Sequence, residues 1–415
     1  MEDGWRVVHE SSDNNKMSAV RAKCGVTPDT EPAELRRELR LDAFHPDYRR
    51  SIRELTSSSI ALEDLADTFP GLLFALASNY ATPDQRQRAF GMIHDGVALR
   101  EIASALDLPW WLRKLPPRAF AAPLPRFPLD RDFTFRISNL IPRDEQLLPT
   151  WLTHVGHACE ACGPSYALWT ARQPDLAEPL GDMSRVMAAW AWFSQREDLP
   201  GHRLLRRPWS FDMSFRRACE ELAAWRQRLR LVECLGPGIE SPWLADGTAL
   251  NFEFVALRTV DDFITESEAL DNCLDQYADH LHSGRTAVFS IRKGERRIAC
   301  VEIGLHDEEV TMPNIVQLRA ARNRRAPPEV WQATYAWLGS QALEPLSPER
   351  NVPKPIRRAE ARRKMWAPYL AFLVGTPHEP PFRRLMLEQV GGRREVRRRP
   401  RAMPRAIRPE LARPA

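Results

Sequence analysis

The fold is decided by the stretch Thr286-Ala287-Val288-Phe289-Ser290-Ile291-Arg292-Lys293-Gly294-Glu295-Arg296-Arg297-Ile298-Ala299-Cys300-Val301-Glu302-Ile303. Two runs rich in β-branched and aromatic residues flank the short polar turn Lys293-Gly294-Glu295, a pattern typical of an antiparallel hairpin. A third run, Ile315-Val316-Gln317-Leu318-Arg319, follows the acidic turn Asp307-Glu308-Glu309. The sequence therefore predicts three consecutive antiparallel strands.

Helices and one earlier strand are predicted around this hairpin. Residues 251–257 have strand character, a short helix starts at Thr259, a longer helix covers Glu268 to His282, and a last helix covers Pro328 to Gln341. The predicted order is β-α-β-β-β-α, so we expect an α+β module at residues 245–345 with helices packed on one sheet face. Cys273 shares the apolar face of the longer helix, and we expect its thiol to be buried.

The sequence pattern before this module predicts a helical region at residues 33–235. Helical periodicity recurs at about 133–141, 146–172, 182–196 and 211–231, with Trp or Phe at the spacing of a buried face. Five prolines between residues 116 and 128 indicate an extended connector, because proline lacks the backbone donor that helices and central strands need. The composition changes at Gly236-Pro237-Gly238, so we expect a domain boundary near residues 235–248.

Both ends of the chain are polar. Residues 1–32 lack periodicity and are predicted to be disordered, residues 346–390 to form a short basic helix and a linker, and residues 391–415 to form an Arg/Pro-rich disordered tail. The tail carries a net charge of +7 within a chain of net charge +4, so the rest carries −3. Arg397, Arg398 and Arg399 in such a tail are candidates to bind nucleic acid or an acidic protein partner, or only to keep the protein in solution.

Composition also bears on the compartment. No apolar run reaches the roughly 20 residues needed to cross a bilayer, and the first residues lack the apolar core of a signal peptide. Seven cysteines, an odd number, indicate free thiols rather than a disulfide framework. We therefore expect a cytoplasmic protein without membrane contact, and nothing in the sequence implies a cofactor.

A candidate metal site lies in the helical region. His154, His157, Cys159 and Cys162 are all of residue types that bind zinc. On a continuous helix their side chains would spread around more than half of its circumference, whereas tetrahedral zinc needs them to converge. Gly163-Pro164 is a possible helix end that would allow a loop to fold back. The alternatives are a structural zinc site, ordinary helical side chains, and a CxxC redox pair, for which the thioredoxin-type strand context is lacking.

One motif of the α+β module resembles a known family. The segment Ala269-Leu270-Asp271-Asn272-Cys273-Leu274, followed by Tyr277, is similar to the helix motif of PcfJ-like proteins. The strand that contains Glu302 and the segment from Gln317 to Asn323 are similar to that family as well. Asn272 stands where many members have His, and Ala320 where Gly is usual. The resemblance implies a bacterial protein associated with mobile genetic elements, and it implies no established activity.

Three hypotheses remain open for these residues. In the first, Cys273 is a nucleophile in a polar cleft with Glu302, Gln317 and Asn323. On a continuous helix His280 would lie about 10 Å from Cys273, too far to activate it, and His306 is a further candidate base.

The second hypothesis is a binding module, in which Gln317, Arg319 and Asn323 line the cleft. Phosphate contacts would then come from Arg322, Arg324, Arg325 and the tail. In the third hypothesis, Cys273 is a small core residue and the polar side chains satisfy backbone groups of a loop. The module would then act as a scaffold.

Overall fold

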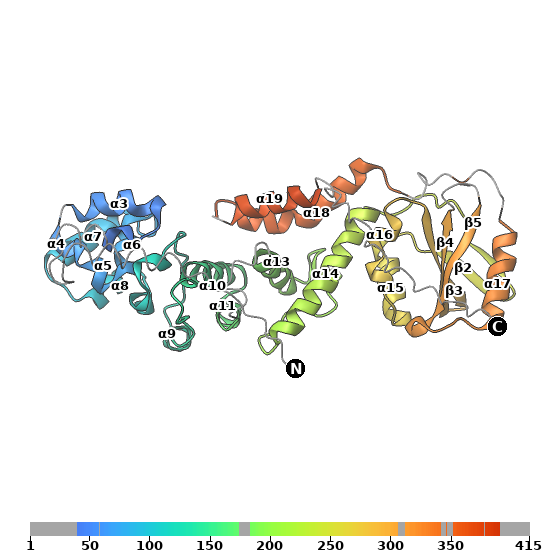
Figure 1. The fold of residues 1–415 in the computed structure, drawn as a ribbon, viewed down its shortest axis with the longest axis horizontal. Coiled ribbons are helices and arrows are strands. Elements are labelled where there is room, and N and C mark those ends of the chain that lie inside the picture. The colour runs from blue at the N-terminus through green and yellow to red at the C-terminus, as the bar shows by residue number, and fades with distance from the viewer. Residues whose placement is uncertain are drawn as a thin grey trace, which may run out of the picture. The chain divides into compact units, whose positions relative to one another are not determined.

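The computed structural model describes residues 40–57, 59–173, 183–305, 312–341, 346, 352–376 and 378–390 (Figure 1). Contacts within the chain divide it into two units, Met1–Tyr369 and Leu370–Ala415. The predicted disordered termini at 1–32 and 391–415, with Arg397, Arg398 and Arg399, lie outside the described residues, and so does His306. Within the described ranges, no helix has the length and apolar character needed to span a membrane.

The first part of the chain is helical, as predicted. Its α-helices are α3 Pro46–Thr56, α4 Ile60–Glu63, α5 Leu65–Thr68, α6 Pro70–Ala77, α7 Pro83–His94, α8 Leu99–Ala105, α9 Arg131–Ser138, α10 Leu148–Cys162, α11 Pro164–Ala171, α13 Met183–Ser194 and α14 Phe215–Leu235. Short 3-10 helices occur at Trp110–Lys114, Pro117–Ala119 and His202–Leu204. The predicted helix at 146–172 is interrupted at Gly163, whose φ of 81° ends α10 before α11 begins.

The tryptophans at helical spacing form a core, as their pattern predicts. Trp169, Trp190 and Trp225 are fully buried, and the ring of Trp225 lies 5.8 Å from that of Trp366 on α18 (Pro355–Leu373). The helix predicted at about 211–231 begins only after the N-cap Ser214, so Phe211 lies in the preceding turn and is exposed rather than part of a buried face. A last helix, α19, covers Glu379–Val390.

The α+β module that follows the helical region contains a sheet of five antiparallel strands in the order β1-β2-β3-β4-β5. They are β1 Gly247–Ala249, β2 Phe252–Ala256, β3 Thr286–Lys293, β4 Arg296–Leu305 and β5 Pro313–Ala320. The α+β class is confirmed, with one strand more than predicted. β1 pairs with β2 through a two-residue turn in which Leu250 and Asn251 both take positive φ angles.

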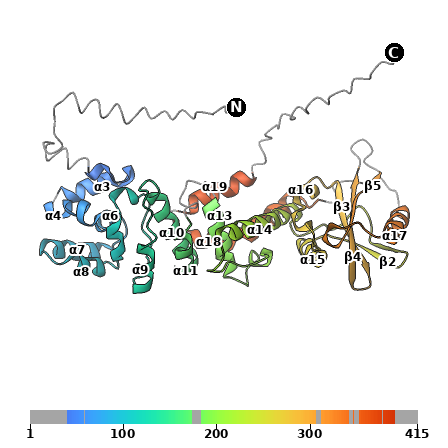
Figure 2. The same ribbon diagram turned by 60° about the horizontal axis from the view of Figure 1, so that its bottom comes forward.

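Helices cover both faces of this sheet, not one face as the sequence predicted. Helix α17 (Pro328–Gly339) packs on the first face, where Trp337 stacks on Phe254 at 4.6 Å between ring centroids. Helices α14 and α15 (Val260–Leu270) pack on the other, in a cluster that includes Leu235, Phe263 and Val288. Figure 1 and Figure 2 both show α15 and α17 on opposite sides of the strands. Both faces are apolar enough for this because β3 and β4 are buried along most of their length.

The predicted continuous helix from Glu268 to His282 is wrong. Helix α15 ends at Leu270, the 3-10 helix η5 covers Leu274–Gln276, and α16 covers Ala278–Leu281. The break occurs at Asp271, which adopts the left-handed conformation with φ 48° and ψ 56°. This break decides where the motif side chains lie.

Candidate functional site

The turn that follows α15 presents Cys273 to solvent. Ser267 Oγ donates a 2.6 Å hydrogen bond to the carbonyl oxygen of Asn272, and Asn272 Oδ1 accepts one of 3.1 Å from the backbone N–H of Leu274. These two bonds satisfy backbone groups of the turn itself, the carbonyl of Asn272 and the N–H of Leu274. Cys273 is exposed, so the prediction that it lies on a buried helical face is wrong. The physical reason is the left-handed Asp271, which rotates the following residues away from the helical face.

A hydrogen-bonded network lies on the sheet face behind this turn. Tyr277 Oη donates to Glu302 Oε2 at 3.0 Å, and Gln317 Nε2 donates to Tyr277 Oη at 3.0 Å. The strand register places Glu302 of β4 directly opposite Gln317 of β5. Burial, followed by the negative charge of Glu302, raises the pKa of Tyr277 well above its ordinary value. The phenol therefore stays protonated at neutral pH and keeps donating to the carboxylate.

His280 joins this network through the second carboxylate oxygen. Its Nδ1 lies 3.4 Å from Glu302 Oε1, and its ring stacks on that of Tyr277 at 4.7 Å. Glu302 is buried, whereas the His280 side chain is 56% exposed. A buried carboxylate beside one ring nitrogen is the arrangement that orients a histidine for acid–base chemistry. The sequence prediction missed this contact because it extended one helix through residue 271.

Cys300 lies on the same sheet face, beneath the turn. Asn272 Nδ2 donates to its Sγ at 3.7 Å. Burial first, then the charges of Glu266, Cys273 and Glu302, raise the pKa of Cys300 to about 12. Cys300 is therefore an inert thiol at neutral pH. A negative charge on Cys273 would also raise the pKa of Tyr277.

The structure unites only part of the predicted catalytic set. Glu302 and Gln317 are joined through Tyr277, whereas Asn323 lies in the exposed 3-10 helix η6 (Ala321–Asn323) beyond the end of β5. Asn323 and Arg322 both have positive φ angles, 55° and 59°. Arg322 is held by an ion pair of 3.2 Å from its Nε to Asp271 Oδ2, which ties η6 to the end of α15.

Basic residues gather at one end of the sheet, which we call the basic end. Its members are Arg292, Lys293, Arg296, Arg297, Arg319, Arg322, Arg324 and Arg325. The register pairs Lys293 with Arg296 at the tip of the β3–β4 hairpin, and it pairs Ala299 near the start of β4 with Ala320 at the end of β5. The hairpin tip and the loop after β5 therefore lie at the same end. Sequence reasoning found the loop arginines and missed the hairpin, whose signal was the run Arg292-Lys293-Gly294-Glu295-Arg296-Arg297.

Acidic side chains neutralise only part of this charge. Glu266 pairs with Arg297 at 2.8 Å, Asp271 pairs with Arg322, and Glu253 lies opposite Arg292 in the strand register. Glu295 sits in the hairpin turn itself. Over the described part of the chain, Lys293, Arg296, Arg324 and Arg325 form no ion pair, and all four are exposed. The basic end therefore keeps a net positive charge facing solvent.

The four candidate zinc ligands do not converge among the described residues. His154 Nε2 lies 3.0 Å from Ser184 Oγ, and His157 Nε2 lies 3.2 Å from Tyr369 Oη. Burial raises the pKa of Cys159 to about 11 and that of Cys162 to about 12. All four residues belong to the continuous helix α10, which spreads their side chains around its axis.

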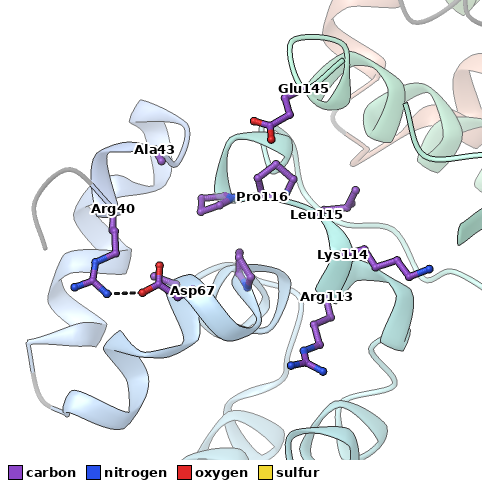
Figure 3. Close-up of a pocket in the computed structure, with 11 residues that line it drawn as sticks. Arg40, Ala43, Asp67, Arg113, Lys114, Leu115, Pro116 and Glu145 are labelled. Atoms are coloured by element: carbon purple, nitrogen blue, oxygen red, sulfur yellow. Dashed lines mark hydrogen bonds and ion pairs between the residues drawn. The ribbon is translucent and has the colours of Figure 1, made fainter. Parts of the chain in front are cut away.

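A separate surface pocket lies in the helical region (Figure 3). It encloses about 530 Å³ and is lined by Arg113, Lys114, Glu145 and the ion pair between Arg40 and Asp67, among others. Basic and acidic side chains are mixed around it, so it has no single charge preference. Pro116 and Pro117 of the predicted connector line this pocket, whereas none of the predicted catalytic, binding or metal residues does.

Comparison with known proteins identifies the α+β module. Residues 245–335 match the model of the family described as PcfJ-like protein. No curated protein and no solved structure matches the chain. The matched range contains all five strands, the turn at Cys273, the Glu302 network and the basic end. The chain therefore carries a PcfJ-like domain at residues 245–335, the family that the motif around Asn272 and Tyr277 indicates.

Proposed function

We propose that this protein is a nucleic-acid-binding protein whose PcfJ-like domain contacts phosphates through the basic end of its sheet. The observation that carries the proposal is the strand register, which brings two basic segments, Arg292–Arg297 and Arg319–Arg325, to one place. Arginine guanidinium groups bind phosphate oxygens in a bidentate way and stay charged at every physiological pH. Exposed arginines without acidic partners are available for such contacts.

The Arg-rich segment at 391–415 supports the same proposal from outside the described residues. Its net charge of +7 adds phosphate contacts without sequence preference. We infer a cytoplasmic protein that acts by binding rather than by catalysis, in the setting of mobile genetic elements that the family resemblance implies. The helical region would then serve as a scaffold that presents the domain.

Replacing Arg296, Arg324 and Arg325 together with alanine is expected to weaken nucleic-acid binding and to reduce its salt dependence. Each lost phosphate contact lowers the slope of log affinity against log salt by about 0.7 to 0.9. Fluorescence anisotropy over a salt series measures both quantities. The matched control is Arg50→Ala, Arg100→Ala and Arg216→Ala, three exposed arginines outside the domain. Equal slopes for wild type and the basic-end variant would refute the proposal, and deleting 391–415 tests the tail separately.

A second candidate function, a cysteine-dependent enzyme, is favoured by one observation. Cys273 is exposed beside a network in which Glu302 orients His280. If His280 acts as a base, it would take the thiol proton of Cys273 and release a nucleophilic thiolate, with Gln317 and Asn323 as polar groups near the substrate. This is the alternative that the motif residues raise.

Alkylation of the native protein at about pH 8 is expected to modify Cys273 well before four cysteines whose pKa is raised, because only thiolates react. Burial raises the pKa to about 11 for Cys159 and Cys234, and to about 12 for Cys162 and Cys300. Peptide mapping by mass spectrometry follows each site, and Cys273→Ser should abolish the fast reaction. If His280 activates the thiol, His280→Gln slows labelling of Cys273 about tenfold or more. An unchanged rate in that variant excludes the enzymatic alternative.

A further inference from the structure

An aromatic pair stands next to the basic end. Helix α17 begins at Pro328, three residues after Arg325, and carries Trp331 and Tyr335 one turn apart. Their ring centroids lie 5.9 Å apart with an interplanar angle of 33°. Tyr335 is 61% exposed, whereas Trp331 is half-buried against the edge of the core. The helix backbone and the contact with Trp331 position the ring of Tyr335.

The position of the pair on α17 separates it from the buried face of that helix. Val330, Ala333 and Trp337 point to the sheet and are fully buried. Trp331 and Tyr335 follow Val330 and Thr334 by one residue each, so they occupy one flank of the helix. Glu329, the acidic residue of the first turn, lies about 160° from Trp331 around the helix axis. The aromatic flank is therefore free of a neighbouring acidic residue from its own helix.

A cationic surface next to an exposed, rigid aromatic side chain has a specific ligand chemistry. Phosphates bind the cations, and an unpaired base stacks on the ring. In a duplex the bases are stacked within the helix and offer no free face, so an aromatic side chain on a helix surface adds nothing to duplex binding. The chain from Arg325 to Tyr335 spans at most about 20 Å, which is the length of only a few nucleotides.

Resting on the proposed function, we infer that the domain binds single-stranded nucleic acid, with phosphates on the basic end and bases stacked on Tyr335 and Trp331. The salt-dependent part of the affinity then comes from the arginines. The stacking part comes from the aromatic pair and does not depend on salt. The Arg319–Arg325 backbone bridge fixes the loop between these two parts, because it ties the segment before α17 to β5.

The test uses the full chain with a labelled single strand about 20 nucleotides long and the duplex of the same length. Tyr335→Ala is expected to lower the single-strand affinity about 5- to 100-fold while the salt slope stays unchanged. Tyr335→Phe keeps the stacking surface and should bind like wild type. Gln332→Ala, an exposed change on the same helix, is the matched control.

The outcomes separate this inference from the proposed function. Two results together support the inference. Wild type should bind the single strand more tightly than the duplex, and Tyr335→Ala should weaken binding of the single strand while leaving binding of the duplex unchanged. Salt-dependent binding of both forms with Tyr335→Ala equal to wild type overturns the single-strand inference and leaves the phosphate interface intact. Absence of salt-dependent binding to either form overturns the interface and this inference together.

Discussion

Trp337→Ala is expected to destabilise the PcfJ-like domain by about 3–5 kcal/mol, the cost typical of removing a large aromatic side chain from a core. Trp337 is fully buried between α17 and the sheet. Its ring stacks on Phe254 at 4.6 Å with an interplanar angle of 3°, and it lies 4.7 Å from the ring of Phe289. Alanine would leave a cavity between α17 and the sheet.

The effect should be measured by hydrogen exchange at the amides of β2, β3 and β4. The expected destabilisation raises the equilibrium constant for opening of these strands, and therefore their exchange rates, by about 10²-fold to more than 10³-fold. Trp337→Phe is the matched control, because the indole N–H of Trp337 has no hydrogen-bond partner among the described residues and its loss costs little. If both variants exchange at the wild-type rate, α17 does not hold this face of the sheet. Because α17 also carries Tyr335, Trp337→Ala should weaken single-strand binding as well.

Arg228→Ala is expected to cost about 3–5 kcal/mol, since it leaves a buried carboxylate without its partner. Arg228 on α14 is 2% exposed, and its Nε lies 3.0 Å from Oδ2 of the buried Asp275 in η5. Its Nη2 makes a second ion pair of 3.0 Å with the more exposed Glu268. These contacts fasten the segment that carries Cys273 to a helix outside the family match. Loss of the guanidinium should therefore loosen η5 and the turn before it.

Arg230→Ala supplies the matched control on the same helix. Arg230 pairs with Asp279, but both side chains are about half exposed, so water replaces the lost partner. The expected cost is at most about 1 kcal/mol. Hydrogen exchange of residues 260–281 compares the two variants directly. Equal effects of Arg228→Ala and Arg230→Ala would contradict the role given to the buried pair.

The α+β class and the order of the strands from β2 to β5 could be predicted from the sequence. Strands alternate their side chains with a period of two residues, and short polar turns allow only antiparallel pairing between neighbours. The central strands at 286–291 and 297–303 lie inside the observed β3 and β4. The small strand β1 could not be predicted, because its three residues gain their conformation from pairing with β2 and from packing near Trp337.

The candidate site was predicted in part, for reasons that individual residues make clear. Glu302 and Gln317 could be assigned to neighbouring antiparallel strands from the sequence, and the observed register places them opposite each other, next to an irregularity between Glu302 and Ile303. The surroundings of Cys273 were not predictable, because the helical periodicity of the sequence continues through residue 271, whereas helix α15 ends at Leu270. The left-handed Asp271 accepts a hydrogen bond from Arg322, which belongs to a loop 51 residues away in the sequence.

By itself, the sequence determined the antiparallel sheet, the tryptophan core and the family of the domain, because local periodicity and residue type encode them. Only the tertiary structure decided that Cys273 is exposed, that His280 meets Glu302, and that two basic segments share one end of the sheet. These are contacts between residues distant in sequence, so they depend on register and on a single backbone break rather than on any local pattern.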